Sequence, residues 1–303
     1  MQSFKPRIST IILTYRRDDA LPATLERLHR IVGDRADHQI ILIDNNADGV
    51  VREKMLEAFP AFPRRVCITL DSNRGVTGGR NAGIVQAEGD ILVFLDDDAL
   101  LEGDADLYDR LLARFDAEPD LGAVAFRSWM REKGASDPIE FPHTDKTLLR
   151  HKLFDTFRFI GVGHALRRSA LDKVGMYPES FFYGMEEFEL SFRLIKAGYR
   201  ISYDPTFTVT HMKAEGGRLV RKDVVERMYA NKLFIAWRHL PAGEALLCAC
   251  AWAAKTLIDS RDPLSVFRAV SAFTKNVKSE AARREPSREL VNRIRALGGT
   301  PWK

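Results

Sequence analysis

Residues 89–99 read GDILVFLDDDA, a short apolar run that ends abruptly at three consecutive aspartates. Residues 91–95 are apolar on both faces, which is typical of a buried strand in a parallel sheet. Carboxylates that directly follow such a strand repel one another strongly unless a positive charge lies among them. Mg²⁺ and Mn²⁺ bind carboxylate and phosphate oxygens together. Asp96, Asp97 and Asp98 therefore predict a metal site that takes a nucleotide diphosphate, with a solvated acidic loop as the alternative.

Three similar apolar runs precede this strand, at residues 8–14, 39–43 and 66–70. Such an alternation of strands and helices predicts a doubly wound α/β sheet, whose ligands bind beyond the carboxyl ends of the strands. Apolar residues at helical spacing fill the intervals: Leu21, Leu25, Leu28 and Val32, then Val51, Met55 and Phe59, with a third helix expected at residues 79–87.

The pattern loosens after residue 99. Residues 130–157 show no clear period, and a long irregular segment inside a compact domain is typical of a functional region. We expect strands at residues 122–129, 161–167, 200–203 and 208–211, helices at 106–116, 169–174 and 186–198, and, from Val220 onward, helices broken at Pro241, Pro263, Pro286 and Gly298-Gly299.

Polar residues follow the expected strands. Residues 73–83, NRGVTGGRNAG, form a glycine-rich loop at the start of a helix, with neither a Walker motif nor a GxGxxG fingerprint. The glycines either let the backbone approach a phosphate, with Arg80 supplying charge, or make a tight strand–helix turn. Asp44 follows the second strand, where it either accepts from a base N–H or ribose hydroxyl or caps the next helix.

Two adjacent acids, Glu186 and Glu187, open an expected helix in GMEEFELSFR, residues 184–193. Acids at a helix start usually complement the helix dipole. The aromatic approach FFYG, residues 181–184, instead suits a carboxylate tuned as a general base. His211 ends a short strand, and a lone histidine is more often structural than a ligand.

The composition excludes several classes of protein. With 45% hydrophobic and 29% charged residues, the 303-residue chain is not mostly disordered. Its longest uncharged apolar run, residues 245–254, is too short to span a membrane, and the N-terminus lacks the apolar region of a signal peptide. Three cysteines offer no disulfide framework, which suits a reducing cytosol. A net charge of +4 is too mild to indicate a nucleic-acid partner.

Five segments, taken in order, resemble the family 2 glycosyltransferases with the GT-A fold, over residues 7–211. They are STIILTYRR, QIILIDNNADG, NRGVTGGRNAGIVQAEGDILVFLDDDA, GHALRRSALDKVGMYPESFFYGMEEFELSFRLIKAGYRISYDP and TVTH. The resemblance implies a Rossmann-like, mostly parallel central sheet with flanking helices. It places a catalytic domain at residues 1–215, with a nucleotide-binding half at about 1–100 and an acceptor half at about 101–215. A basic helical extension, residues 216–303, would follow.

The resemblance also implies roles for individual residues. Glu187 matches the second position of the family's acidic pair, the catalytic base of inverting members, with Glu186 beside it. Glutamate stands where aspartate is commoner, so the reach is one methylene longer. Thr14, Tyr15, Arg16, Asp44, Arg80, Asn81, Asp96 and Asp97 match residues near the nucleotide-sugar, and Asp96, Asp98 and His211 match the metal shell.

The activity that the resemblance implies is transfer, with inversion, of a sugar from a UDP- or dTDP-sugar to a hydroxyl of a saccharide or lipid-linked saccharide. Mn²⁺ or Mg²⁺ would assist, and the product would be a cell-surface polysaccharide or glycolipid. A cytoplasmic enzyme, peripheral at the inner face of the membrane, would fit. A metal-dependent sugar nucleotidyltransferase and a non-catalytic sugar-binding scaffold remain alternatives.

The charge is unevenly spread along the chain. Residues 260–303 hold ten Lys/Arg and four Asp/Glu, a balance of +6, which leaves −2 for the rest. Two interpretations follow: the C-terminal helices pack on the catalytic domain or form a homodimer, or they dock on an anionic membrane. The first apolar face has Val266, Phe267, Val270, Phe273 and Val277, and the basic residues that accompany it are Arg268, Lys275, Lys278, Arg283 and Arg284. A second helix, which Ser287 would cap, carries the apolar residues Leu290, Val291, Ile294 and Leu297.

Overall fold

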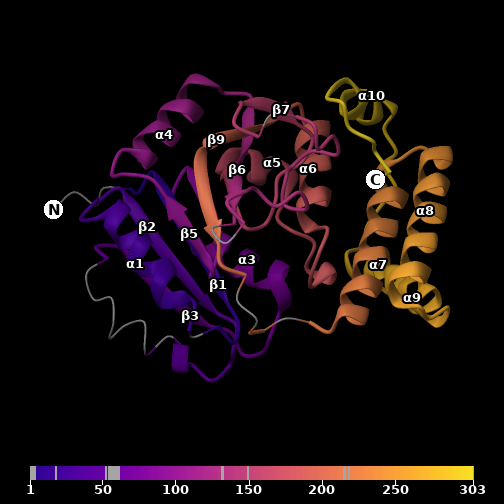
Figure 1. The fold of residues 1–303 in the computed structure, drawn as a ribbon, viewed down its shortest axis with the longest axis horizontal. Coiled ribbons are helices and arrows are strands. Elements are labelled where there is room, and N and C mark those ends of the chain that lie inside the picture. The colour runs from indigo at the N-terminus through magenta and orange to yellow at the C-terminus, as the bar shows by residue number, and fades with distance from the viewer. Residues whose placement is uncertain are drawn as a thin grey trace.

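The computed structural model describes residues 5–17, 19–51, 53, 62–130, 133–148, 150–213, 216–217 and 219–302. Met55 and Phe59, in the second expected helix, lie outside them. The first four strands are parallel, in the spatial order β3-β2-β1-β4, as the alternation predicted (Figure 1). They are β1 (Ile8–Thr14), β2 (His38–Asp44), β3 (Arg65–Thr69) and β4 (Ile91–Asp96), with helices α1 (Leu21–Val32) and α3 (Gly75–Gln86) between them.

The other strands extend the same sheet, some in parallel and some in antiparallel orientation. β8 (Gly163–Arg167) is antiparallel to β4 and to β6 (Leu121–Trp129), and β6 is parallel to β9 (Arg200–His211). β5 (Ala99–Glu102) and β7 (Phe154–Thr156) add antiparallel edges to β9. The sheet of the described residues is therefore mixed, and its parallel part lies mainly in the first hundred residues.

One strand, β9, replaces the two strands expected at residues 200–203 and 208–211. Its register with β6 shifts between Phe126 and Arg127, which pair with Asp204 and Thr208. The residues between Asp204 and Thr208, including Pro205, form a bulge, because proline has no N–H to donate to the ladder. The strand is thus continuous, and the expectation of a break was wrong.

The glycines of residues 73–83 serve close packing of α3 on the sheet. The helix begins at Gly75, four residues before the predicted start. A Cβ on Gly79 would lie 2.3 Å from Leu13 Cδ1, and one on Gly83 would lie 2.5 Å from Ile11 Cγ2. The first helical N–H groups, those of Gly75 and Val76, donate to Asn73 Oδ1 and to the carbonyl of Phe182. These contacts support the tight-turn interpretation over a backbone cradle for phosphate.

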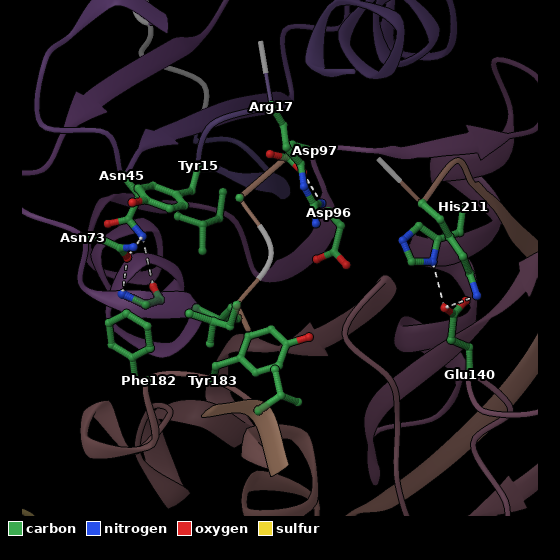
Figure 2. A pocket seen from close by; sticks show the side chains of 17 residues that line it. Tyr15, Arg17, Asn45, Asn73, Asp96, Asp97, Glu140, Phe182, Tyr183 and His211 are labelled. Atoms are coloured by element: carbon green, nitrogen blue, oxygen red, sulfur yellow. Dashed lines mark hydrogen bonds and ion pairs between the residues drawn. The ribbon is translucent and has the colours of Figure 1, made fainter. Parts of the chain in front are cut away.

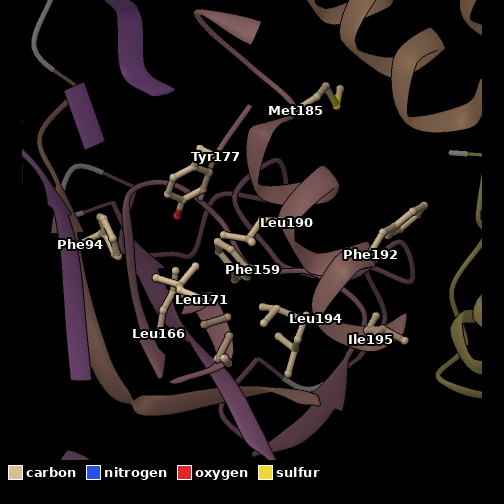
Figure 3. Close-up of a cluster of buried hydrophobic side chains, with 14 of the residues drawn as sticks. Phe94, Phe159, Leu166, Leu171, Tyr177, Met185, Leu190, Phe192, Leu194 and Ile195 are labelled. Carbon is tan, nitrogen blue, oxygen red and sulfur yellow. The ribbon is translucent and has the colours of Figure 1, made fainter. Parts of the chain in front are cut away.

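The main core lies between the sheet and α6 (Glu186–Lys196), as Figure 3 shows. Leu190, Leu194 and Ile195 of α6 are buried with Phe94 of β4 and Leu166 of β8. This packing fixes the N-terminal turn of α6, which carries Glu186 and Glu187, relative to the end of β4. α4 (Leu107–Ala117), α5 (Arg168–Val174) and the short 3₁₀ helix η1 (Glu179–Phe181) complete this part of the chain.

Four helices follow, with breaks where the prolines and glycines predicted them: α7 (Arg221–His239), α8 (Ala242–Ser260), α9 (Leu264–Ser279) and α10 (Arg288–Ala296). Ser287 caps α10 as expected, accepting from the N–H of Leu290. α10 packs against α6, and Glu189 of α6 forms an ion pair with Arg238 of α7 at 3.0 Å. The extension therefore contacts the sheet domain through α7 and α10, although a domain boundary at residue 215 stays a prediction.

Some of the apolar residues of the C-terminal extension are buried in the structure, and others are exposed to solvent. Leu290, Val291 and Ile294 are buried, and Val266, Phe273 and Val277 pack partly buried, which supports packing on the rest of the chain. Phe267 and Val270 are exposed. Among the described helices, none is long and apolar enough to cross a membrane.

Candidate active site

A cavity of about 400 Å³ opens at the carboxyl ends of the strands, where the doubly wound pattern predicted ligand binding. Figure 2 shows its two ends: aromatic and amide side chains gather at one, acidic groups and a histidine at the other. The labelled lining residues are Tyr15, Arg17, Asn45, Asn73, Asp96, Asp97, Glu140, Phe182, Tyr183 and His211.

The acidic end brings together the three residues expected to hold a metal. One ligand atom from each of Asp96, Asp98 and His211 lies within 4.8 Å of the others. The histidine reaches them because β9 runs beside β5, which places His211 opposite Ala99. Two carboxylates and an imidazole are donors that Mn²⁺ accepts readily, and Mg²⁺ accepts the carboxylates. The donor set therefore fits a divalent cation.

Asp97 faces a different partner. Arg17 Nη1 lies 2.8 Å from Asp97 Oδ1 and 3.1 Å from Asp98 Oδ2. Burial raises the pKa of Asp97 to about 6, although the charge of Arg17 opposes that rise. Arg17, which itself lines the cavity, thus relieves the repulsion among the three aspartates, a role that the sequence did not reveal.

Glu140 was also missed, because it lies in the segment without a period. His211 Nδ1 donates to Glu140 Oε1 at 2.8 Å, while His211 Nε2 lies 3.4 Å from Asp98 Oδ1. Burial alone would lower the pKa of His211, but hydrogen bonds to Asp98 and Glu140 outweigh it and raise that pKa to about 10. Ser128 and Lys213 also contact Glu140. Glu140 therefore fixes the orientation of the imidazole.

Arg80 connects the acidic triplet to the acidic pair of α6. Its buried guanidinium lies 3.2 Å from Asp96 Oδ1, 3.0 Å from Glu187 Oε1 and 3.5 Å from Glu186 Oε1. Nη2 also donates to the carbonyl of Gly161. A Cβ on Gly161 would lie 2.4 Å from Glu187 Oε1 and 2.9 Å from Arg80 Nη2. The absence of a side chain at Gly161 therefore leaves room for the ion pair.

The two glutamates of the pair differ in environment. The side chain of Glu186 is 4% exposed and that of Glu187 is 15% exposed. Burial, and then repulsion from Glu187, raise the pKa of Glu186 to about 8, and Arg80 only partly opposes this rise. Its surroundings therefore favour the protonated form of Glu186, and Glu187 is the glutamate that forms the shorter ion pair with Arg80.

At the aromatic end, Asn45 Nδ2 donates to Asn73 Oδ1 at 2.9 Å, and Tyr15 and Phe182 lie nearby (Figure 2). The preceding residue, Asp44, is buried, and its Oδ1 accepts from the backbone N–H and side-chain amide of Asn46. This contact fixes the turn after β2, from which Asn45 reaches the cavity.

Three further predicted residues, Thr14, Arg16 and Asn81, are not among those that line the cavity. Thr14 is buried where β1 ends. The guanidinium of Arg16 lies 5.2 Å from the ring centroid of Tyr15, and its backbone N–H donates to Asn46. Asn81 is buried, and its side-chain amide pairs with the backbone N–H and carbonyl of Tyr177. Asn81 thus anchors the chain before η1.

Solved structures with the same fold are glycosyltransferases. The chain superposes on the mannosyltransferase PcManGT from Pyrobaculum calidifontis, solved with GDP-Man and Mn²⁺, with a TM-score of 0.58 and 17% identity, covering 97% of this chain and 79% of that one. For GalNAc-T7 with UDP, GalNAc and Mn²⁺ the TM-score is 0.64, at 13% identity, and 97% and 57% of the chains are covered. These likenesses establish the GT-A fold.

Two relatives are similar in sequence. An uncharacterized protein of Haemophilus influenzae is 30% identical over 181 residues, which are 57% of this chain and 94% of that protein. The poly-beta-1,6-N-acetyl-D-glucosamine synthase of Staphylococcus aureus is 28% identical over 209 residues, 65% of this chain. The match spans 48% of the synthase, about half its length.

A sequence model of a whole family establishes which family the chain belongs to. The sequence model described as "Glycosyl transferase family 2" matches residues 9–175, more than half of the 303 residues. That range contains the four parallel strands, the acidic triplet and Arg80. The chain belongs to glycosyl transferase family 2.

Proposed function

We propose that this chain is an inverting, metal-dependent glycosyltransferase that moves a sugar from a nucleoside-diphosphate-sugar to an acceptor hydroxyl. One observation carries the proposal: Arg80 lies between Asp96 of the acidic triplet and Glu187 of the acidic pair. A cation site and a candidate general base thereby share one positively charged neighbour. Such an array suits a reaction in which an anion departs and a hydroxyl loses its proton.

The donor would lie along the cavity. Tyr15, Phe182 and the Asn45–Asn73 pair offer ring faces and amides for a nucleoside, and we propose a pyrimidine there, in a UDP- or dTDP-sugar. The diphosphate would then reach Asp96 and the metal site. The structural neighbours support a nucleotide-sugar donor in general, since TarS of S. aureus (TM-score 0.59, 15% identity) was solved with UDP-GlcNAc.

A divalent cation held by Asp96, Asp98 and His211 would supply Lewis-acid stabilisation of the diphosphate. Arg80 would offset negative charge that develops on the departing nucleoside diphosphate. Glu187 would accept the proton of the acceptor hydroxyl as its oxygen attacks the anomeric carbon from the face opposite the leaving group. A single displacement of this kind inverts the anomeric configuration and needs no covalent glycosyl-enzyme.

We propose a saccharide or lipid-linked saccharide as the acceptor, in the synthesis of a cell-surface polysaccharide or glycolipid. The similarity to a polysaccharide synthase supports this class. The irregular residues 130–157 are the best candidates for acceptor contacts, because Glu140 of this segment reaches the cavity.

A panel of nucleotide-sugars with Mn²⁺, assayed with and without oligosaccharide acceptors, tests the proposed function. We expect release of nucleoside diphosphate. NMR of the product should show that the anomeric configuration of the transferred sugar is inverted relative to the donor. In a parallel reaction with a nucleoside triphosphate and a sugar 1-phosphate, release of pyrophosphate would instead identify a nucleotidyltransferase. Saturable donor binding without any turnover across the panel would favour a sugar-binding scaffold.

Glu140 provides a prediction about the metal site. Glu140→Ala is expected to weaken Mn²⁺ binding about 10–100-fold, because His211 loses the partner that orients its ring. Glu140→Gln should lose less, since an amide oxygen still accepts from Nδ1–H. Titration of Mn²⁺ followed by electron paramagnetic resonance measures the affinity. Glu102→Ala is the matched control, since Glu102 accepts from Thr210 of the same strand, and equal losses in the two alanine variants would contradict the prediction.

A further inference from the structure

Helix α8 exposes an apolar face. It has no charged residue between Glu244 and Lys255, and along its length only Cys248 and Thr256 are fully buried. Leu246 and Leu247 near its start and Leu257 and Ile258 near its end are exposed to solvent, Ile258 by 74%. The spacing of these two pairs, about three helical turns, places both on one side of the helix.

Helix α9, which follows α8 after the short turn at residues 261–263, also exposes apolar residues at its start. Leu264 and Phe267 in its first turn are exposed, Phe267 by 72%. Both helices pack on α7 and contact each other (Figure 1). Single exposed apolar residues are ordinary, but a group on one hairpin indicates an interaction surface. We define the apolar patch as Leu246, Leu247, Leu257, Ile258, Leu264 and Phe267.

Basic residues accompany the patch. α9 carries Arg268, Lys275 and Lys278 and no acidic residue. Lys275 and Lys278 are exposed, and neither forms an ion pair within the part of the chain that the structure describes. The acid within the turn, Asp262, already pairs with Lys222 at 2.8 Å, and Asp259, beside Ile258, pairs with Lys255. The surface of α9 therefore changes along the helix from apolar to cationic, over roughly 12–16 Å from Phe267.

The change from apolar to basic side chains along α9 helps to decide whether this surface binds a second copy of the chain or a membrane. A symmetric contact between two copies, centred on the patch, would bury its apolar side chains but offer no acid of α9 to Lys275 and Lys278 of either copy. An anionic bilayer complements both parts, because its acyl region accepts leucine, isoleucine and phenylalanine while its headgroups attract lysine. We propose that the α8–α9 hairpin docks the chain on an anionic membrane surface, with the apolar patch inserted and Lys275 and Lys278 at the headgroups.

Flotation of the full chain with vesicles tests the docking. We expect binding to phosphatidylcholine vesicles that contain phosphatidylglycerol, with loss on raising the salt, and little binding to phosphatidylcholine alone. Ile258→Ser with Phe267→Ser should lower the partition coefficient at least about tenfold. Lys275→Glu with Lys278→Glu should lower it roughly 25-fold or more, since each basic residue near the surface contributes about fivefold.

Matched controls lie elsewhere on the chain. Val85 and Leu153 are exposed on the sheet domain, so Val85→Ser with Leu153→Ser removes comparable apolar area. Lys133→Glu with Lys152→Glu makes the same change in net charge. Binding by both controls supports docking, provided circular dichroism shows that all variants are folded. No flotation of the wild-type chain, equal loss in the controls, or a dimer that Ile258→Ser with Phe267→Ser dissociates would overturn it.

Discussion

Asp98→Ala is expected to abolish sugar transfer and to weaken binding of the nucleoside diphosphate. Asp98 is fully buried between Arg17, at 3.1 Å, and His211, at 3.4 Å, where its carboxylate would hold the cation that joins protein and diphosphate. Loss of that cation removes stabilisation of the leaving group that Arg80 alone does not replace. Turnover with the best donor of the panel, and nucleotide affinity by calorimetry, measure the two effects.

The control for Asp98→Ala is Asp71→Ala, an exposed aspartate in the loop after β3, which should keep full activity. Asp98→Asn tests whether loss of charge or loss of volume matters, since asparagine keeps the shape of the buried side chain. His211→Ala should reduce Mn²⁺ affinity with a smaller loss of turnover. Full activity of the wild-type chain in excess EDTA would refute metal dependence altogether.

Much of the candidate metal site could be predicted from the sequence because its residues stand at the ends of strands. An apolar run followed by Asp96, Asp97 and Asp98 indicates both a strand and a cluster of charge at its end. His211 is more than a hundred residues away in sequence, and by itself it suggested a structural role. The family resemblance paired it with the aspartates, and the β5–β9 ladder brings its ring to them.

Glu140 and Arg17 could not be assigned in the same way. Glu140 lies in a segment with no period, so its contact with His211 depends on a loop path that residue pattern does not specify. Arg17 was visible as one of two adjacent arginines, but its pairing with Asp97 depends on how the loop after β1 packs beside the end of β4. Both interactions join residues that are far apart in the sequence, so the secondary-structure propensity of the residues around them does not predict them.

The glycines of α3 left two interpretations open in the sequence, an approach of the backbone to phosphate and a tight strand–helix turn. In the structure Gly79 and Gly83 lie inside the helix and face Leu13 and Ile11. Composition alone does not distinguish a backbone that approaches a ligand from one that approaches a strand. Both need the absence of a Cβ.

Glu187→Gln is expected to leave donor binding nearly unchanged while lowering kcat about 10²–10⁴-fold, because the amide cannot accept the acceptor proton. Glutamine is nearly isosteric and still accepts from Arg80, so the structure around Gly161 should persist. Steady-state kinetics with varied donor and acceptor separate the loss of kcat from any change in KM.

The adjacent residue supplies the matched control. Glu186→Gln should lower kcat by less than about tenfold near pH 7, because Glu186 already holds its proton there. Burial and repulsion from Glu187 raise the pKa of Glu186 to about 8, so we expect Glu186 to lose its proton as the pH rises through that region. The wild-type pH profile should therefore change near pH 8, and Glu186→Gln should remove that change.

The reverse ranking would assign the base to the other glutamate. If Glu186→Gln were inactive and Glu187→Gln active, the ion pair with Arg80 would be structural, and the more buried acid would accept the proton. The present geometry favours Glu187, because it is the more exposed of the two and lies closer to Arg80. The guanidinium of Arg80 also contacts Asp96. Proton acceptance by Glu187 and departure of the diphosphate would therefore occur on opposite sides of the Arg80 side chain.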